Sequence, residues 1–181
     1  MSEVRALFGM SRTALLMRHL LYQSQSQYLN SYLMNGDADG DAGYLKAEMS
    51  AEWTTRVSEF DREAAEIEAR AKSAGVSFVV AFVPNRAQAL MVSTNEWPEG
   101  YDPYQLDNEL RRVVASHGGI YIDTLPDFRT VVSPERGYLP VDDHPNAYGH
   151  EIITKLLAKE LTSGAVPALQ VAAQQAAVEQ R

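Results

Sequence analysis

The chain of 181 residues contains no cysteine. This absence excludes disulfides, a thiol nucleophile and a thiolate metal site within the chain. It leaves the redox compartment open, because a protein without thiols suits reducing and oxidising surroundings equally well. Long apolar runs are absent too, and without a stretch of about 18 apolar residues no membrane-spanning helix is expected.

Positive charge is also scarce, since 16 Lys and Arg residues face 24 Asp and Glu residues and the formal net charge is −8. Proteins that bind nucleic acid need a basic surface that displaces counterions from phosphates, so no nucleic-acid partner is expected. The first residues, Met1 to Arg5, show neither a basic region leading into an apolar core nor a processing site. We therefore expect no export signal in this chain.

The apolar residues that are present predict alternating helices and strands. Helical spacing covers residues 11–34, 50–74, 103–116 and 147–161, and short apolar runs at 76–83 and 120–123 predict strands. The run at 76–83 has the composition of a strand covered on both faces of a parallel sheet. This order predicts an α/β fold with a parallel sheet flanked by helices. Two strands are few for such a sheet, so we expect it to be incomplete at its N-terminal side.

Residues 1–162 are predicted to form part of a single domain. The segment 163–181 is rich in Ala and Gln and is expected to be a frayed helix or disordered. Two histidines receive structural interpretations. His19 stands among apolar residues and is expected in the core, and His117 is expected as a cation at a helix C-terminus.

The segment Asp142-Asp143-His144-Pro145-Asn146 combines the groups of an acid–base site. A histidine acts as a general base when its ring is oriented and its cation stabilised, commonly by a carboxylate on the nitrogen that faces away from the substrate. Pro145 restricts His144 to extended conformations, and Asn146 is suited to cap the helix expected from Ala147. The structural alternative is a polar loop that ends in a helix cap.

The longer stretch from Pro140 to His150, followed by an amphipathic helix, resembles the last motif block of the SGNH (GDSL-type) hydrolases. Gly75 to Asn85 and Gly119 to Leu125 resemble later core strands of that family, so the resemblance covers roughly residues 50–161. It implies a three-layer, flavodoxin-like fold and a catalytic His144. It also implies that Gly149 allows close helix packing, and that His150 is structural.

The commoner family pattern has an aspartate three residues before the histidine, and here Val141 occupies that position. Asp142 stands two residues before His144, a spacing that resembles the branch with alginate-type O-acetyltransferases. The resemblance therefore favours Asp142 as the residue that orients His144. Asp143 is the second choice and is expected to be solvated.

The family's Gly-Asp-Ser turn, which supplies the nucleophile, does not occur in the sequence. The nearest match is Gly9-Met10-Ser11, but a predicted helix follows directly, so Ser11 is interpreted as a helix N-cap. The chain is therefore expected to be the C-terminal part of an ester hydrolase or O-acyltransferase that acts on a small-molecule or carbohydrate ester without a cofactor. The alternative is a non-catalytic binding or assembly module of the same fold.

Two further segments suggest ligands. Asp37, Asp39, Asp41 and Glu48 match positions 1, 3, 5 and 12 of an EF-hand calcium loop, although position 6 is Ala42 where a glycine is needed. A solvated acidic insertion is the alternative. Zinc ligation by His144 and His150 is disfavoured, because their spacing separates them along a helix turn.

Arg86 is predicted to follow a strand at the sheet edge where such folds place their sites, and it could orient an anionic or carbohydrate substrate. An ion pair within the loop is the alternative. Trp97, Tyr101 and Tyr104 could line a sugar or acyl pocket, although aromatic residues in such segments more often bury a loop.

Overall fold

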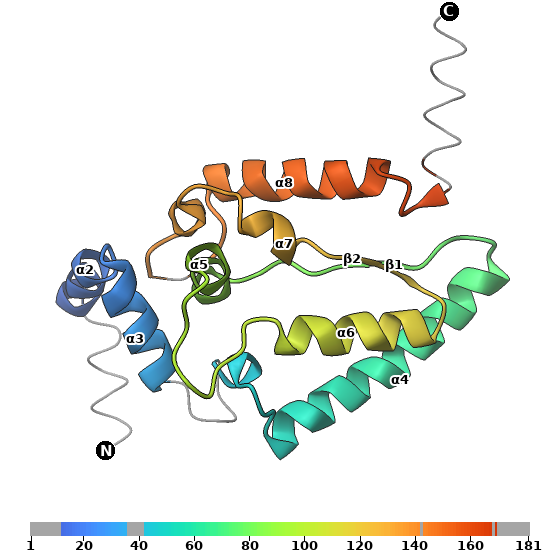
Figure 1. Cartoon of the computed structure of the whole chain (residues 1–181), viewed down its shortest axis with the longest axis horizontal. Helices are drawn as coiled ribbons and strands as arrows, with labels where there is room; N and C mark the ends of the chain where they lie inside the picture. Colours follow the sequence, from blue (N-terminus) through green and yellow to red (C-terminus); the bar gives the residue numbers. More distant parts are fainter. Residues whose placement is uncertain (1–11, 36–41, 142, 168, 170–181) are drawn as a thin grey trace, which may run out of the picture.

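The structure is a computed structural model that describes residues 12–35, 42–141, 143–167 and 169. Seven α-helices and two strands make up this described part (Figure 1). The helices are α2 Arg12–Leu21, α3 Gln25–Asn35, α4 Ala51–Ser73, α5 Arg86–Thr94, α6 Gln105–Ser116, α7 Leu125–Phe128 and α8 Ala147–Thr162; the 3-10 turns are η1 Gly43–Leu45 and η2 Pro134–Gly137, and the strands are β1 Val79–Ala81 and β2 Ile120–Ile122.

The two strands pair in parallel, with Val79 opposite Ile120 and Ala81 opposite Ile122. Helices lie on both sides of the pair: α8 and α7 on one side, α6 and α4 on the other (Figure 1). The predicted mixed α/β architecture with a parallel sheet is therefore confirmed. It follows from a strand–helix–strand connection, which returns the chain to the same end of the sheet.

The expected strand 76–83 is shorter than predicted and is not covered on both faces. Val76 is 61% exposed and Val83 41%, and Ala81 is also exposed. Within the described residues, β2 is the only strand that pairs with β1. The other edge of β1 is therefore open in the described part of the chain, although the composition of the segment fits a central position in a sheet.

The helix predicted over 11–34 is divided into α2 and α3, with a turn at 22–24. The carbonyl of Tyr22 accepts a hydrogen bond from the guanidinium of Arg86, which lies 64 residues further along the chain. The interruption thus coincides with a contact to a residue distant in sequence, which no local pattern indicates. The prediction of a core His19 is wrong, because α2 contains no buried residue and His19 is exposed.

The most buried helix, α5, was not expected. Residues 86–92 are all buried, and Ala87, Ala89, Met91 and Val92 have no exposed surface. Asn85 begins the helix, with its side chain accepting a hydrogen bond from the backbone N–H of Gln88 at 2.9 Å. Because α5 follows β1 directly, it occupies the centre of the C-terminal end of the sheet (Figure 1).

The predicted tail falls mostly outside the described residues, but its beginning packs on the fold, since Val166 is only 4% exposed. The predicted Ser11 N-cap also lies outside them. Among the described helices, none is long and apolar enough to cross a membrane.

Candidate functional site

Residues 137–141 and 143–146 are joined by backbone hydrogen bonds and lead into α8. The backbone N–H of Leu139 donates to the carbonyl of His144 at 2.8 Å, and the N–H of Asn146 donates to the carbonyl of Gly137 at 2.8 Å. An isolated antiparallel bridge joins Tyr138 to Pro145. These hydrogen bonds hold the backbone on both sides of His144 in place.

The predicted cap at Asn146 is confirmed, since its Oδ1 accepts from the N–H of Gly149 at 3.1 Å. Its Nδ2 donates to the carbonyl of Arg136 at 2.7 Å. The first turn of α8 also lies directly against η2. A Cβ added to Gly149 would come within 2.0 Å of the carbonyl oxygen of Gly137. The close packing expected at Gly149 is therefore present, and it fixes the helix against the turn.

Two bonds tie this turn to the end of β1. The hydroxyl of Tyr138 donates to the carbonyl of Pro84 at 2.7 Å, and the guanidinium of Arg86 donates to the carbonyl of Pro140 at 3.0 Å. Pro84 belongs to the connection between β1 and α5, and Arg86 is the first residue of α5. The turn that carries His144 is therefore positioned at the C-terminal end of the sheet, where open α/β sheets place their ligands.

Arg86 is buried, with 3% of its surface exposed. Besides Pro140, its guanidinium donates to the carbonyl of Tyr22 at 2.5 Å and to Oε1 of Gln25 at 3.3 Å, and it lies 3.9 Å above the centre of the Tyr28 ring. These contacts occupy the guanidinium with groups of the protein. The structure thus gives Arg86 a positioning role between α2, α3 and the His144 turn.

Asp143 is not solvated, contrary to the prediction. Its Oδ2 accepts a hydrogen bond from the hydroxyl of Tyr28 at 2.8 Å, and the residue is half-buried. Burial, together with the neighbouring carboxylate, raises the pKa of Tyr28 well above its ordinary value, so this hydroxyl remains a donor. The backbone of Asp143 has a left-handed φ of 58°. Asp142, the favoured orienting residue, lies outside the described residues.

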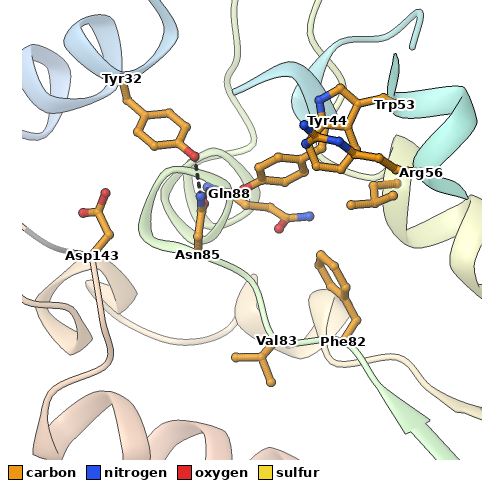
Figure 2. A pocket seen from close by; sticks show the side chains of 10 residues that line it. Tyr32, Tyr44, Trp53, Arg56, Phe82, Val83, Asn85, Gln88 and Asp143 are labelled. Atoms are coloured by element: carbon orange, nitrogen blue, oxygen red, sulfur yellow. Dashed lines mark hydrogen bonds between the residues drawn. The ribbon is translucent and has the colours of Figure 1, made fainter. Parts of the chain in front are cut away.

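His144 is exposed and lines a cavity of about 220 Å³, together with Pro84, Asn85 and Tyr138. A larger cavity of about 490 Å³ adjoins it, and its lining includes Tyr32 of α3, Trp53 of α4 and Gln88 of α5. The two share Val83, Asn85 and Asp143. Figure 2 shows these side chains around the larger cavity, with Asn85 bonded to the hydroxyl of Tyr32 at 2.8 Å.

The other sequence-based candidates are placed elsewhere. Asp37, Asp39 and Asp41 lie outside the described residues, and Glu48 is exposed in an irregular stretch. An EF-hand loop leads directly into its second helix, whereas here Lys46 is extended and α4 begins only at Ala51. The described residues contain no cluster of three or more His, Asp or Glu side chains able to hold a metal.

The aromatic segment packs against the core, and Trp97 also lines a separate cavity of about 390 Å³ with Leu29 and Leu90. Trp97 and Tyr101 pack against the core cluster formed by α3, η1 and α5, and the hydroxyl of Tyr101 accepts from Nζ of Lys46 at 2.8 Å. Trp97 also meets Tyr104 edge-on, with ring centres 6.0 Å apart. His117 ends α6, as expected, and its Nε2 lies 2.5 Å from Oδ1 of Asp61.

Sequence reasoning missed four residues of the site: Tyr28, Tyr32, Asn85 and Gln88. A signal existed for two of them, because Asn followed three residues later by Gln is a helix-capping pattern, and it stands directly after the predicted strand. Tyr28 and Tyr32 gave no such signal. Their role depends on contacts with Asp143 and Asn85, 115 and 53 residues away.

Comparison of the chain with protein-family models, with curated proteins and with solved structures finds no match.

Proposed function

We propose that this chain carries the acid–base part of an ester hydrolase or O-acyltransferase of the SGNH type. In this proposal His144 is the general base, and Asp142 orients its ring and stabilises the imidazolium. The observation that carries the proposal is the position of His144. It is exposed, is held in a turn closed by backbone hydrogen bonds, and lines a cavity at the C-terminal end of β1.

In the proposed reaction a serine hydroxyl attacks the carbonyl carbon of an ester. Nε2 of His144 accepts the hydroxyl proton as the bond to carbon forms, and then donates it to the departing alcohol oxygen. Water or a second alcohol then attacks the acyl–serine carbonyl while His144 takes its proton, and His144 returns this proton to the serine oxygen as the acyl–serine bond breaks. The same residues serve hydrolysis and transfer.

The serine and the oxyanion-stabilising groups are proposed to come from strands that join the free edge of β1. This edge has no partner strand among the described residues, and Val76 and Val83 beside it are exposed. Exposed apolar residues along an unpaired strand are typical of a sheet that continues. We propose the three-layer SGNH arrangement for that completed sheet.

A second function is a non-catalytic binding or assembly module of the same fold. It is favoured by α2, in which Leu15, Leu16, Met17, Leu20 and Leu21 are all more than 40% exposed. An apolar helix surface of this kind commonly marks a contact with another chain. A binding module does not need an oriented imidazole, so the state of the His144 ring separates the two functions.

The chain by itself is expected to lack serine-esterase activity. A fluorophosphonate probe should leave every serine unlabelled, and hydrolysis of p-nitrophenyl acetate should be equal in the wild type and in His144→Ala. Without a nucleophile the base has no proton to remove, and missing oxyanion donors cost about 10²–10³ in rate as well.

An active serine esterase, treated in parallel, provides the positive control for the probe. Labelling of a serine in this chain, located by mass spectrometry with Ser11 tested first, would contradict a nucleophile supplied by other strands. Turnover that disappears in His144→Ala would contradict it equally.

A further inference from the structure

The lining of the larger cavity includes three buried polar groups without a hydrogen-bond partner among the described residues: the amide oxygen of Gln88, the indole N–H of Trp53 and the hydroxyl of Tyr44. Gln88 has no exposed surface, and its amide extends from α5 toward the cavity (Figure 2). Its Nε2 donates to the carbonyl of Pro103 at 2.6 Å. Among the described residues, no group donates to its Oε1, and none accepts from the indole N–H of Trp53. The cavity thus presents one acceptor on Gln88, one donor on Trp53, and the hydroxyl of Tyr44, which can act as either.

The groups on Gln88 and Trp53 define what a ligand must offer. Leaving a buried acceptor and a buried donor unpaired is costly, so a ligand that satisfies both is favoured. An aliphatic acyl chain offers neither a donor nor an acceptor. A hydroxyl group offers both, and a ring that carries several hydroxyls can reach Gln88 and Trp53 at the same time.

The charges around the cavity favour a neutral ligand. Arg56 is the cation of the lining, and its guanidinium is already paired with Glu52 one turn earlier in α4. It also lies 4.6 Å above the ring of Trp53. The remaining charged group is Asp143, which would repel an anion. An anionic ligand would therefore find no uncommitted positive charge in the lining.

The aromatic residues supply apolar area of suitable shape. The rings of Tyr44 and Trp53 lie 5.6 Å apart at an angle of 54°, and Phe82 and Leu106 complete this part of the lining. Flat aromatic faces next to polar groups suit a molecule that is apolar on its ring faces and polar at its edges. A cyclic sugar has this distribution.

We propose that the larger cavity binds a neutral sugar ring, with one hydroxyl donating to Oε1 of Gln88 and another oxygen accepting from the indole N–H of Trp53. A further step rests on the proposed function. Because the cavity shares Val83, Asn85 and Asp143 with the one at His144, the bound sugar is the alcohol part of the ester.

Nuclear magnetic resonance of the ¹⁵N-labelled chain tests the binding directly. The sequence has two tryptophans, Trp53 and Trp97, so the spectrum contains two indole N–H signals. The probes are methyl glycosides of glucose, galactose, mannose, xylose and N-acetylglucosamine, each up to about 50 mM, which detects Kd values in the millimolar range. We expect at least one to shift the Trp53 signal while the Trp97 signal stays unchanged.

Gln88→Met keeps the volume of the side chain but removes the acceptor, and it should raise Kd at least about tenfold, equal to about 1.4 kcal/mol. Gln105→Met, on α6 outside the cavity lining, should leave Kd unchanged. Trp53→Phe keeps a ring and removes the donor, so it provides a second variant should Gln88→Met fold poorly. Trp53→Phe should also weaken sugar binding. Because this variant lacks the Trp53 indole signal, its binding is measured through the backbone amide signal of Gln88.

Failure of every sugar to shift the Trp53 signal would overturn the inference, as would equal binding by Gln88→Met. A shift produced by octanoate and by no sugar would also overturn it, because the cavity would then be an acyl site. The assay does not involve catalysis, so sugar binding without an oriented His144 would refute the proposed function and leave this inference intact.

Discussion

Gly149→Ala is expected to lower the free energy of unfolding by about 3 kcal/mol, although alanine normally favours a helix over glycine by about 1 kcal/mol. The added methyl group would meet the carbonyl oxygen of Gly137 at 2.0 Å. That oxygen also accepts the N–H of Asn146, so it cannot retreat without disturbing the turn that carries His144.

Urea unfolding followed by circular dichroism measures this loss. Thr154→Ala introduces the same residue into an exposed position of α8 and should raise the stability slightly or leave it unchanged. If Gly149→Ala were as stable as the wild type, the close contact between α8 and η2 would be incorrect, and with it the fixed position of His144.

Arg86→Met is expected to lower the free energy of unfolding by about 3 kcal/mol, because hydrogen bonds to a charged group contribute about 1.5–3 kcal/mol each and their acceptors would remain buried. The guanidinium joins the carbonyls of Tyr22 and Pro140, which belong to opposite ends of the chain. Its loss should therefore also detach α2 and α3 from the turn of His144.

Calorimetry gives the change in stability, and hydrogen exchange of the amides of α3 reports the detachment. Arg112→Met is the matched control. Arg112 is an exposed arginine whose side chain bonds to Glu109, and its replacement should not change the melting temperature measurably. Equal behaviour of the two variants would mean that the contacts of Arg86 do not hold these elements together.

Elements whose signals are local were predictable from the sequence. Ser50, Asn146 and Gly75 mark helix ends through their own side chains or backbone conformation, and the predicted limits of α4 and α8 agree with the structure to within two residues. The close approach at Gly149 was expected from the resemblance of this segment to the SGNH motif, and it is present in the structure.

Features that depend on distant contacts were not predictable. The break between α2 and α3 lies at Tyr22, which Arg86 contacts, although the helix looks continuous in sequence. The bond between Tyr28 and Asp143 engages a carboxylate that was expected in water. The larger cavity depends on the same kind of contact, since its walls come from segments between Tyr32 and Asp143. No periodicity in the sequence reports such pairings.

The strand β1 was overestimated for a related reason. Its composition belongs to a strand with neighbours on both sides, whereas the described part of the chain provides one neighbour. The apolar composition of a segment indicates the surroundings in which it is normally buried. The described part of the chain does not supply these surroundings for the end of this segment, and Val83 is 41% exposed.

The tautomer of the His144 ring is the sharpest test of its proposed role as a general base held by Asp142. Long-range ¹H–¹⁵N correlation spectra of the neutral imidazole show which nitrogen carries the proton. A general base held by Asp142 should carry it on Nδ1, leaving Nε2 free to accept a proton from the serine. Asp142→Asn should change this tautomer, and Asp143→Asn should not. A wild-type ring protonated on Nε2, or one indifferent to Asp142→Asn, would contradict the account.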